Sequence, residues 1–166
     1  MPNVPMFIRN RCTSVEQVDE LTIRSTCRLQ DTLTGAAVEI LVKLPDLEII
    51  AAQGEVSRTY RDECLDQSGP LQKMVGVRIG SGMLKIIKGL IGESTACSQL
   101  GFMVEECCHG VILAFTKDTL MQAPRDQELT ADFYREMVKA NTRLLNRCAA
   151  FAPGSSMVEG VEPPSK

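Results

Sequence analysis

The stretch LTIRSTCRL, residues 21–29, alternates apolar or small side chains with polar or charged ones at every second position. A β-strand turns successive side chains to opposite faces of a sheet, so this alternation predicts a strand with one buried face, to which Cys27 belongs. The polar segment 31–35 that follows predicts a turn. The alternation then returns over Val38–Leu44. The two segments together predict an antiparallel pair of strands.

Two further strands extend this pattern. Residues 47–58 follow a turn signal at Pro45-Asp46 and predict a third strand, in which Gly54 indicates a bulge or a close approach by another segment. Residues 6–12 predict an additional edge strand. Because short turns join these segments, they predict an antiparallel sheet of three to four strands in the N-terminal half.

The second half of the chain changes to helical patterning. Strands first and helices second, without strand–helix alternation, predict an α+β fold in which three to four helices pack on one face of a small sheet. The last helix carries an apolar stripe that includes Cys148, which is therefore predicted to lie in the core. The predicted helices cover residues 64–75, 83–90, 96–116 and a segment from the capping residue Thr130 to Phe151.

Length and composition indicate one domain and exclude several classes of function. The chain has 166 residues, enough for a core without disulfides. We expect a single domain over residues 1–151 and a flexible tail rich in Pro, Gly and Ser over 152–166. A net charge of −3 without basic runs disfavours nucleic-acid binding. No apolar run has the length of a membrane span and the N-terminus lacks a signal sequence, so we expect no membrane association and a cytoplasmic protein.

Cysteine is the most distinctive residue type in the chain. Seven cysteines without a CxxC motif or an export signal indicate reduced thiols, most of them acting as small apolar residues. Cys107 and Cys108 fall on apolar stripes of the helix over 96–116, so we expect them to pack in the core. Cys64 and Cys97 lie outside such stripes. Cys97 also occupies the first turn of its helix, where the helix dipole favours a thiolate.

The single histidine gives weaker indications. His109 follows Glu106 at a spacing of three residues on one helix. A carboxylate-bridged metal site needs more copies of this pair on neighbouring helices, and the chain has only one His. A solvated polar face is therefore the favoured interpretation of this pair.

Several short motifs occur in an order that resembles a bacterial family of unknown function. That family shows a Leu-x-Asp, a Cys after the third strand, a Gly-x3-Gly, and a Gly-Cys-Thr-His-Leu signature that opens a helix. The match extends from about Arg11 to Thr116. The matching segments are Leu29-Gln30-Asp31, Cys64, Gly76-Val77-Arg78-Ile79-Gly80 and Ala96-Cys97-Ser98-Gln99-Leu100.

The signature at residues 96–100 departs from the family in three positions. Ala96, Ser98 and Gln99 stand where the family has Gly, Thr and His. The resemblance therefore keeps the Cys97 thiol but not its His partner, and Gln cannot act as a base near neutral pH.

A looser likeness concerns the order of elements. The chain is similar to iron–sulfur scaffold proteins of the NifU type, which also run from antiparallel strands to Cys-bearing helices and carry an Asp and separated cysteines at their site. This likeness implies that Asp31, Cys64 and Cys97 have the corresponding roles. Because a fold does not fix a function, it remains an analogy.

Three hypotheses of function follow. In the first, Asp31, Cys64, Cys97 and Gln99 form a binding module for a metal such as Zn or Fe, a cluster, or a thiol-reactive small molecule. The Cys64 and Cys97 side chains then lie within about 8 Å of each other, whereas one metal would need each sulfur at about 2.3 Å from it. In the second, Cys97 is the nucleophile of an enzyme. In the third, the domain forms a homodimer through one face of the helix over 96–116, which carries Gln99, Phe102, Glu106, His109 and Leu113.

Overall fold

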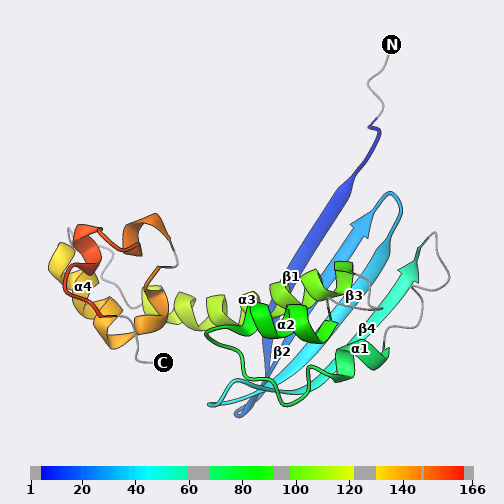
Figure 1. Ribbon diagram of the computed structural model, residues 1–166, viewed down its shortest axis with the longest axis horizontal. Helices are drawn as coiled ribbons and strands as arrows, with labels where there is room; N and C mark the ends of the chain where they lie inside the picture. Colours follow the sequence, from blue (N-terminus) through cyan, green and yellow to red (C-terminus); the bar gives the residue numbers. More distant parts are fainter. Residues whose placement is uncertain (1–4, 60–67, 92–97, 122–129, 147, 163–166) are drawn as a thin grey trace. The chain divides into compact units, whose positions relative to one another are not determined.

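The chain folds into two compact units, Met1–Ala114 and Phe115–Lys166 (Figure 1). The structure is a computed structural model, and it describes residues 5–59, 68–91, 98–121, 130–146 and 148–162. Among the described helices, none combines the length and the apolar character that crossing a bilayer requires.

The first unit is built on a four-stranded antiparallel sheet with the order β1-β2-β3-β4. This sheet, with helices after it, confirms the α+β class and the antiparallel N-terminal half. The edge strand expected over 6–12 is displaced: β1 begins at Arg9 and continues to Asp19, because the mostly polar segment 13–19 pairs with β2 although it has no apolar pattern of its own. The strands are β1 (Arg9–Asp19), β2 (Thr22–Asp31), β3 (Gly35–Lys43) and β4 (Glu48–Arg58).

Alternate residues of β2 and β3 bury one face of the sheet. Cys27 and Leu29 in β2 are fully buried, as are Val38 and Ile40 in β3. The prediction that Cys27 belongs to the buried face is therefore confirmed. The intervening side chains of β2, such as Arg24, lie on the other face, where Arg24 forms ion pairs across the sheet. A half-buried antiparallel sheet of this kind needs helices on one face only.

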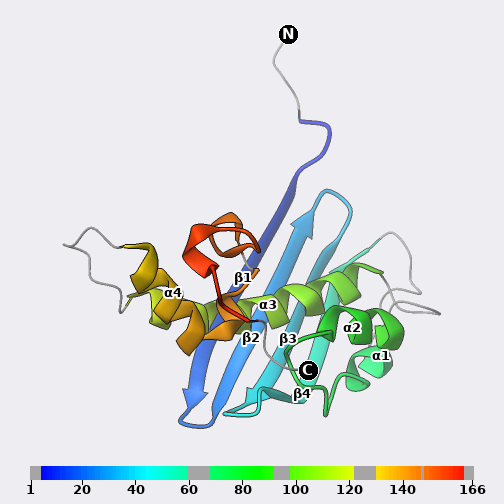
Figure 2. The same ribbon diagram turned by 60° about the vertical axis from the view of Figure 1, so that its left-hand side comes forward.

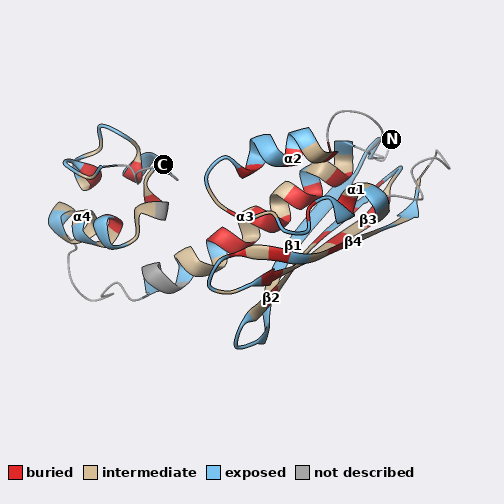
Figure 3. Cartoon of the chain, turned by 60° about the horizontal axis from the view of Figure 1, so that its bottom comes forward, coloured by how far each residue is buried: buried red, intermediate tan, exposed pale blue. Residues whose placement is uncertain are grey.

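The helix α3 (Ser98–Met121) covers the buried face of the sheet. Only its residues up to Ala114 belong to the first unit. Both ribbon views show it crossing the sheet (Figures 1 and 2). Ser25 of β2 donates a hydrogen bond from Oγ to the Cys107 carbonyl oxygen at 2.9 Å. The helix approaches β1 so closely that a Cβ on Gly110 would lie 3.0 Å from Thr13 Cγ2. The buried residues of α3 follow the side that faces the sheet (Figure 3).

Two shorter helices, α1 (Ser68–Gln72) and α2 (Met83–Ile91), complete the first unit. α1 packs on β4 so tightly that a Cβ on Gly54 would lie 2.5 Å from Leu71 Cδ1, which confirms the close approach predicted at this glycine. Gln72 donates from Nε2 to the Ala52 carbonyl oxygen at 2.8 Å. α1 covers only part of the predicted 64–75 helix, of which residues 64–67 lie outside the described residues.

The second unit has a small apolar core of its own. Its helix α4 (Ala131–Ala140) begins at the predicted cap, where Thr130 Oγ1 accepts a hydrogen bond from the Phe133 backbone nitrogen at 3.3 Å. Three short 3-10 helices follow over Thr142–Leu144, Ala149–Phe151 and Ser156–Val158. The buried residues of this core are Val138, Leu144, Phe151 and Val158.

The last predicted helix is wrong beyond Ala140. The helical backbone ends at Asn141, and Asn146 has a φ of 58° in the left-handed region. A change of chain direction there breaks the continuous stripe, so Cys148 is exposed and its predicted place in the core is also wrong. The sequence predicts one domain over 1–151 and a flexible tail over 152–166, whereas the chain divides at Ala114 into two units. Val158, from the expected tail, is 95% buried against the apolar residues of the second unit.

Candidate functional site

Asp31 organises the end of the sheet where β2 turns into β3. Its Oδ2 accepts hydrogen bonds from Arg9 Nε at 2.9 Å and Nη2 at 2.7 Å. Its Oδ1 accepts from the backbone nitrogens of Leu33 at 2.8 Å and Thr34 at 2.6 Å. Arg58, at the end of β4, donates to the Asp31 carbonyl oxygen. One carboxylate therefore joins β1 to the β2–β3 turn, and a second arginine joins β4 to the same residue.

The charge of Asp31 is stabilised in this setting. Burial by itself would raise the pKa of the carboxyl group, but the hydrogen bonds from Arg9, Leu33 and Thr34 outweigh it. The pKa of Asp31 consequently lies below the usual carboxyl value. The Asp31 side chain is only 1% exposed, whereas that of Arg9 is 43% exposed. Asp31 thus positions Arg9 and the turn, and Arg9 is the charged group that a ligand can reach.

A pocket of about 270 Å³ opens beside this network, and we call it the hairpin pocket. Its walls come from all four strands or their ends and from the first turn of α3. Its wall combines polar and apolar residues, which is the usual composition of a site for a small organic ligand. The lining residues are Arg9, Asp31, Leu33, Thr34, Ala36, Val56, Thr59, Ser98, Gln99 and Leu100.

The chemistry of the hairpin pocket is dominated by hydrogen-bonding groups and one cation. The guanidinium of Arg9, the hydroxyl groups of Thr34 and Ser98 and the amide of Gln99 belong to its polar lining. Amides and hydroxyls both donate and accept hydrogen bonds. None of these groups is a base near neutral pH. The pocket is therefore suited to binding and orienting a small polar molecule.

The structure brings together two of the four residues singled out in the sequence. Asp31 and Gln99 line the same hairpin pocket although they lie far apart in the chain. Cys64 and Cys97 both lie outside the described residues, so the expected separation of their sulfurs stays a prediction. In the sequence, Cys97 immediately precedes Ser98, which lines the pocket and begins α3.

Three other cysteines are packing residues, as predicted for Cys107 and Cys108. Cys27, Cys107 and Cys108 are at most 1% exposed. Burial raises the pKa of the Cys108 thiol to about 12 and also raises those of Cys27 and Cys107. Raised pKa values keep these thiols protonated and unreactive. Among the described residues, no group of three or more His, Cys, Asp or Glu side chains is arranged to hold a metal ion.

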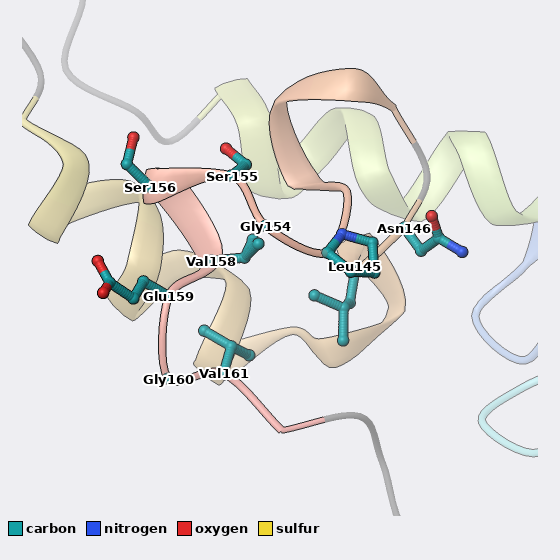
Figure 4. A pocket seen from close by; sticks show the side chains of 10 residues that line it. Leu145, Asn146, Gly154, Ser155, Ser156, Val158, Glu159, Gly160 and Val161 are labelled. Carbon is teal, nitrogen blue, oxygen red and sulfur yellow. The ribbon is translucent and has the colours of Figure 1, made fainter.

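A larger pocket of about 800 Å³ lies within the second unit (Figure 4). Ser155 and Ser156 point away from the apolar side chains of Leu145 and Val161. Ser155 Oγ also accepts a hydrogen bond from the Met157 backbone nitrogen at 3.2 Å. Asn146 and Glu159 also line it, and their side chains point in opposite directions (Figure 4). Glycine, proline and valine make up the rest of its wall. Polar groups do not converge in this pocket, so the hairpin pocket is the better candidate site.

The face of α3 proposed for a homodimer is partly covered by the sheet. The Arg11 guanidinium stacks on the Phe102 ring, with Cζ 4.2 Å from the ring centroid. Phe102 is 37% exposed and Leu113 is 65% exposed. Glu106 and His109 are half-buried. The polar face predicted at Glu106 and His109 is therefore only partly exposed to solvent.

Sequence reasoning missed Arg9 and Arg58 as parts of the site. Arg9 begins β1 and Arg58 ends β4. The register of β1 could not be predicted locally, because this strand has little apolar alternation. The available signal was the buried Asp31 at the end of the alternating strand, because a buried carboxylate requires a cationic or N–H partner. Comparisons of the chain with protein families, curated proteins and solved structures find no match.

Proposed function

We propose that this chain is a cysteine-based binding module that takes a small, thiol-reactive molecule in the hairpin pocket. The observation that carries the proposal is the convergence of Asp31 and Gln99 on one pocket at the start of α3. Cys97 is adjacent in sequence to the pocket residue Ser98. In this proposal the pocket orients the ligand, and the Cys97 thiol bonds to it.

The size and lining of the pocket favour a small organic molecule over a metal ion or cluster. The volume of about 270 Å³ is near the lower end for ligand sites, and its wall mixes apolar and polar residues. A zinc or iron site would need several thiolate, imidazole or carboxylate ligands. Among the described lining residues Asp31 is the only carboxylate, and it already accepts hydrogen bonds on both oxygens from Arg9 and the turn.

Competitive alkylation of the full chain tests the role of the pocket. An N-benzyl chloroacetamide is large enough to use the pocket, whereas iodoacetamide is a smaller reference electrophile. The ratio of the two rate constants is measured at each cysteine by mass spectrometry. We expect this ratio to be about ten-fold higher at Cys97 than at the exposed Cys12, which corresponds to about 1.4 kcal/mol of binding by the pocket.

Two neighbouring alanines provide a matched pair of variants. Ala36 lines the hairpin pocket, whereas Ala37 is not part of its lining and points to the opposite face of β3. Ala36→Leu should lower the ratio at Cys97 to that at Cys12, and Ala37→Leu should leave it unchanged. Equal ratios at Cys97 and Cys12 in the unsubstituted chain would contradict the proposal. Thermal unfolding of both variants checks that each remains folded.

The metal or cluster form of the hypothesis has its own measurement. Protein purified without oxygen is analysed for bound metal and acid-labile sulfide, with Cys97→Ser as the comparison. If the protein contains one metal ion per chain and Cys97→Ser does not, the ligand of this site is a metal and not an organic molecule. Metal-free protein whose stability does not respond to added Zn²⁺ or Fe²⁺ would remove this form, because a ligand bound to the folded state raises stability.

One second candidate is an enzyme with Cys97 as its nucleophile, because Cys97 immediately precedes the pocket residue Ser98 in the sequence. The sequence predicts that Cys97 lies in the first turn of its helix, where unpaired N–H groups favour a thiolate. The rate of Cys97 alkylation by iodoacetamide is measured as a function of pH. Its titration midpoint should then lie below about 8.5, the ordinary pKa of a thiol. A midpoint at or above that value would remove the physical basis for a nucleophile.

A further inference from the structure

The open edge of the sheet carries an inference that is independent of the hairpin pocket. β1 is an edge strand, and most of its residues are exposed. The opposite edge is occupied where β4 begins, because the Ile49 backbone nitrogen donates to the Val77 carbonyl oxygen at 2.9 Å and Ile79 donates to Leu47 at 2.9 Å. Nothing in the described part of the chain pairs in this way along the outer side of β1.

The register shows which backbone groups point to that open side. The Thr32 nitrogen donates to the Ile8 carbonyl oxygen at 3.0 Å, and hydrogen-bonded pairs alternate along an antiparallel ladder. Even-numbered residues of β1 therefore bond to β2. The backbone N–H and C=O groups that point outward belong to Arg9, Arg11, Thr13, Val15 and Gln17. A row of such groups can pair with another strand.

The charges of β1 specify what kind of strand fits. Arg9 and Arg11 lie in its first half, and Glu16 and Asp19 lie in its second half. A parallel copy of β1 would place like charges side by side, whereas an antiparallel copy places the basic half against the acidic half. Arg11 and Asp19 make no ion pair within the described part of the chain, so no side chain there neutralises their charges.

We propose that β1 pairs with β1 of a second copy of this chain, antiparallel about a two-fold axis at Ser14. Ser14 is the midpoint of Arg11–Gln17, the part of β1 that this register pairs before the strand bulges between Gln17 and Asp19. It also satisfies the ladder, because Thr13 then lies opposite Val15 of the second copy and both have outward backbone groups. The contact is isologous and closes, so it produces a dimer with a continuous sheet and no open β1 edge.

The side chain at the axis has to be small. In this ladder the odd-numbered residues of β1 form the hydrogen-bonded pairs. Ser14 therefore lies opposite Ser14 of the second copy in a non-hydrogen-bonded pair, with a Cα separation of about 4.5 Å. Serine fits this separation. A cysteine placed there would meet the geometric requirement for a disulfide, which spans Cα separations of about 4.4–6.8 Å.

The mass of the full chain in solution is the first test. Light scattering after size exclusion, from micromolar to sub-millimolar protein, should give twice the chain mass of 18.2 kDa. A monomer over the whole range overturns the proposal. Thr13→Pro removes one outward N–H while sparing the bonds to β2, and proline is tolerated at such edge positions. It should shift the mass to that of a monomer while the circular dichroism spectrum stays unchanged.

Cross-linking tests the register, and it does so even where Thr13→Pro fails to fold. In a Cys12→Ser background, Ser14→Cys should form a disulfide between positions 14 of two chains on mild oxidation, identified by mass spectrometry. Asn10→Cys is the matched control, because Asn10 is exposed on the same face but would lie about 27 Å from its copy. We expect at least ten-fold more cross-link at position 14. A dimer with no 14–14 cross-link, or equal cross-linking in the control, overturns the proposed interface.

Discussion

At the scale of single residues, the site depends on one buried carboxylate with an exposed partner. Asp31 is almost fully covered, and its hydrogen bonds to Arg9 and to the backbone of Leu33 and Thr34 leave neither carboxylate oxygen free. A group of this kind fixes the position of its neighbours. The Leu-x-Asp motif therefore has a structural explanation here, in which the aspartate joins three strands and presents Arg9 at the pocket.

The variant Asp31→Asn tests this role through its pH dependence. The folded-state pKa of Asp31 lies below its unfolded value, so the ionised group stabilises the fold at neutral pH. This stabilisation is lost as the pH falls from about 4 through the lower folded-state value. We expect Asp31→Asn to lower the Tm at pH 7, and the difference from the unsubstituted chain to shrink below pH of about 4.

Asp19→Asn is the control for this measurement. Asp19 also accepts a backbone hydrogen bond in a turn, from Leu21 at 2.8 Å, but no arginine of the described residues forms an ion pair with it. Its substitution should change the Tm less than Asp31→Asn does. If the difference in Tm between Asp31→Asn and the unsubstituted chain stays constant down to acid pH, the charge of Asp31 contributes nothing to the stability of the fold.

At the scale of elements, the packing of α3 on the sheet depends on a glycine. The added Cβ at Gly110 would lie 3.0 Å from Thr13 Cγ2 and 3.1 Å from Val15 Cγ2. Both neighbours are β-branched and stiff about χ1, so they cannot easily turn away. Gly110 thus sets the depth at which α3 lies on β1 and β2, and this depth also places the start of α3 at the hairpin pocket.

Two substitutions on the same helix separate packing from helix propensity. Gly101→Ala meets only Ile91 Cγ2, at the ordinary contact distance of 3.6 Å, and should stabilise the fold by about 0.5–1 kcal/mol. Gly110→Ala has the same gain in propensity but crowds β1, so we expect a net loss of about 1–3 kcal/mol. Urea unfolding measures both. Equal stabilisation by the two alanines would show that α3 can move away from the sheet freely.

At the scale of the whole molecule, the two units differ in how much core they possess. The first unit buries most of the apolar residues of the chain beneath one sheet face, whereas the second has a core of Val138, Leu144, Phe151 and Val158. Small units bury a lower fraction of their surface and are correspondingly less stable. Their local stabilities should therefore differ.

Hydrogen exchange followed by mass spectrometry checks this difference. We expect amides of the central strands β2 and β3 to exchange at least ten-fold more slowly than amides of α4 and of the 3-10 helix over Ser156–Val158. Backbone groups of the central strands are paired on both sides within the sheet, while those of a single-turn helix are not. Comparable protection in α4 and in β2 would mean that the core of the second unit is stabilised by contacts beyond its own residues.

The sequence by itself determined the elements whose pattern is local. The alternation over 21–29 predicts β2 and the burial of Cys27, and the stripes of the helix over 96–116 predict the burial of Cys107 and Cys108. Thr130 predicts the start of α4 because a cap needs only its own first turn. These predictions succeed because periodicity and capping depend on residues within a few positions of one another.

Only the tertiary structure decided the extent of β1, the end of α4 and the composition of the pocket. β1 has no apolar pattern over residues 13–19, and it is held in the sheet by pairing with β2. The reversal near Asn146 depends on the core that Val158 completes from the following segment. Arg9, Asp31 and Gln99 meet at one pocket because the strand register and the depth of α3 bring them there. These are relations between distant segments, and no local spacing in the sequence encodes them.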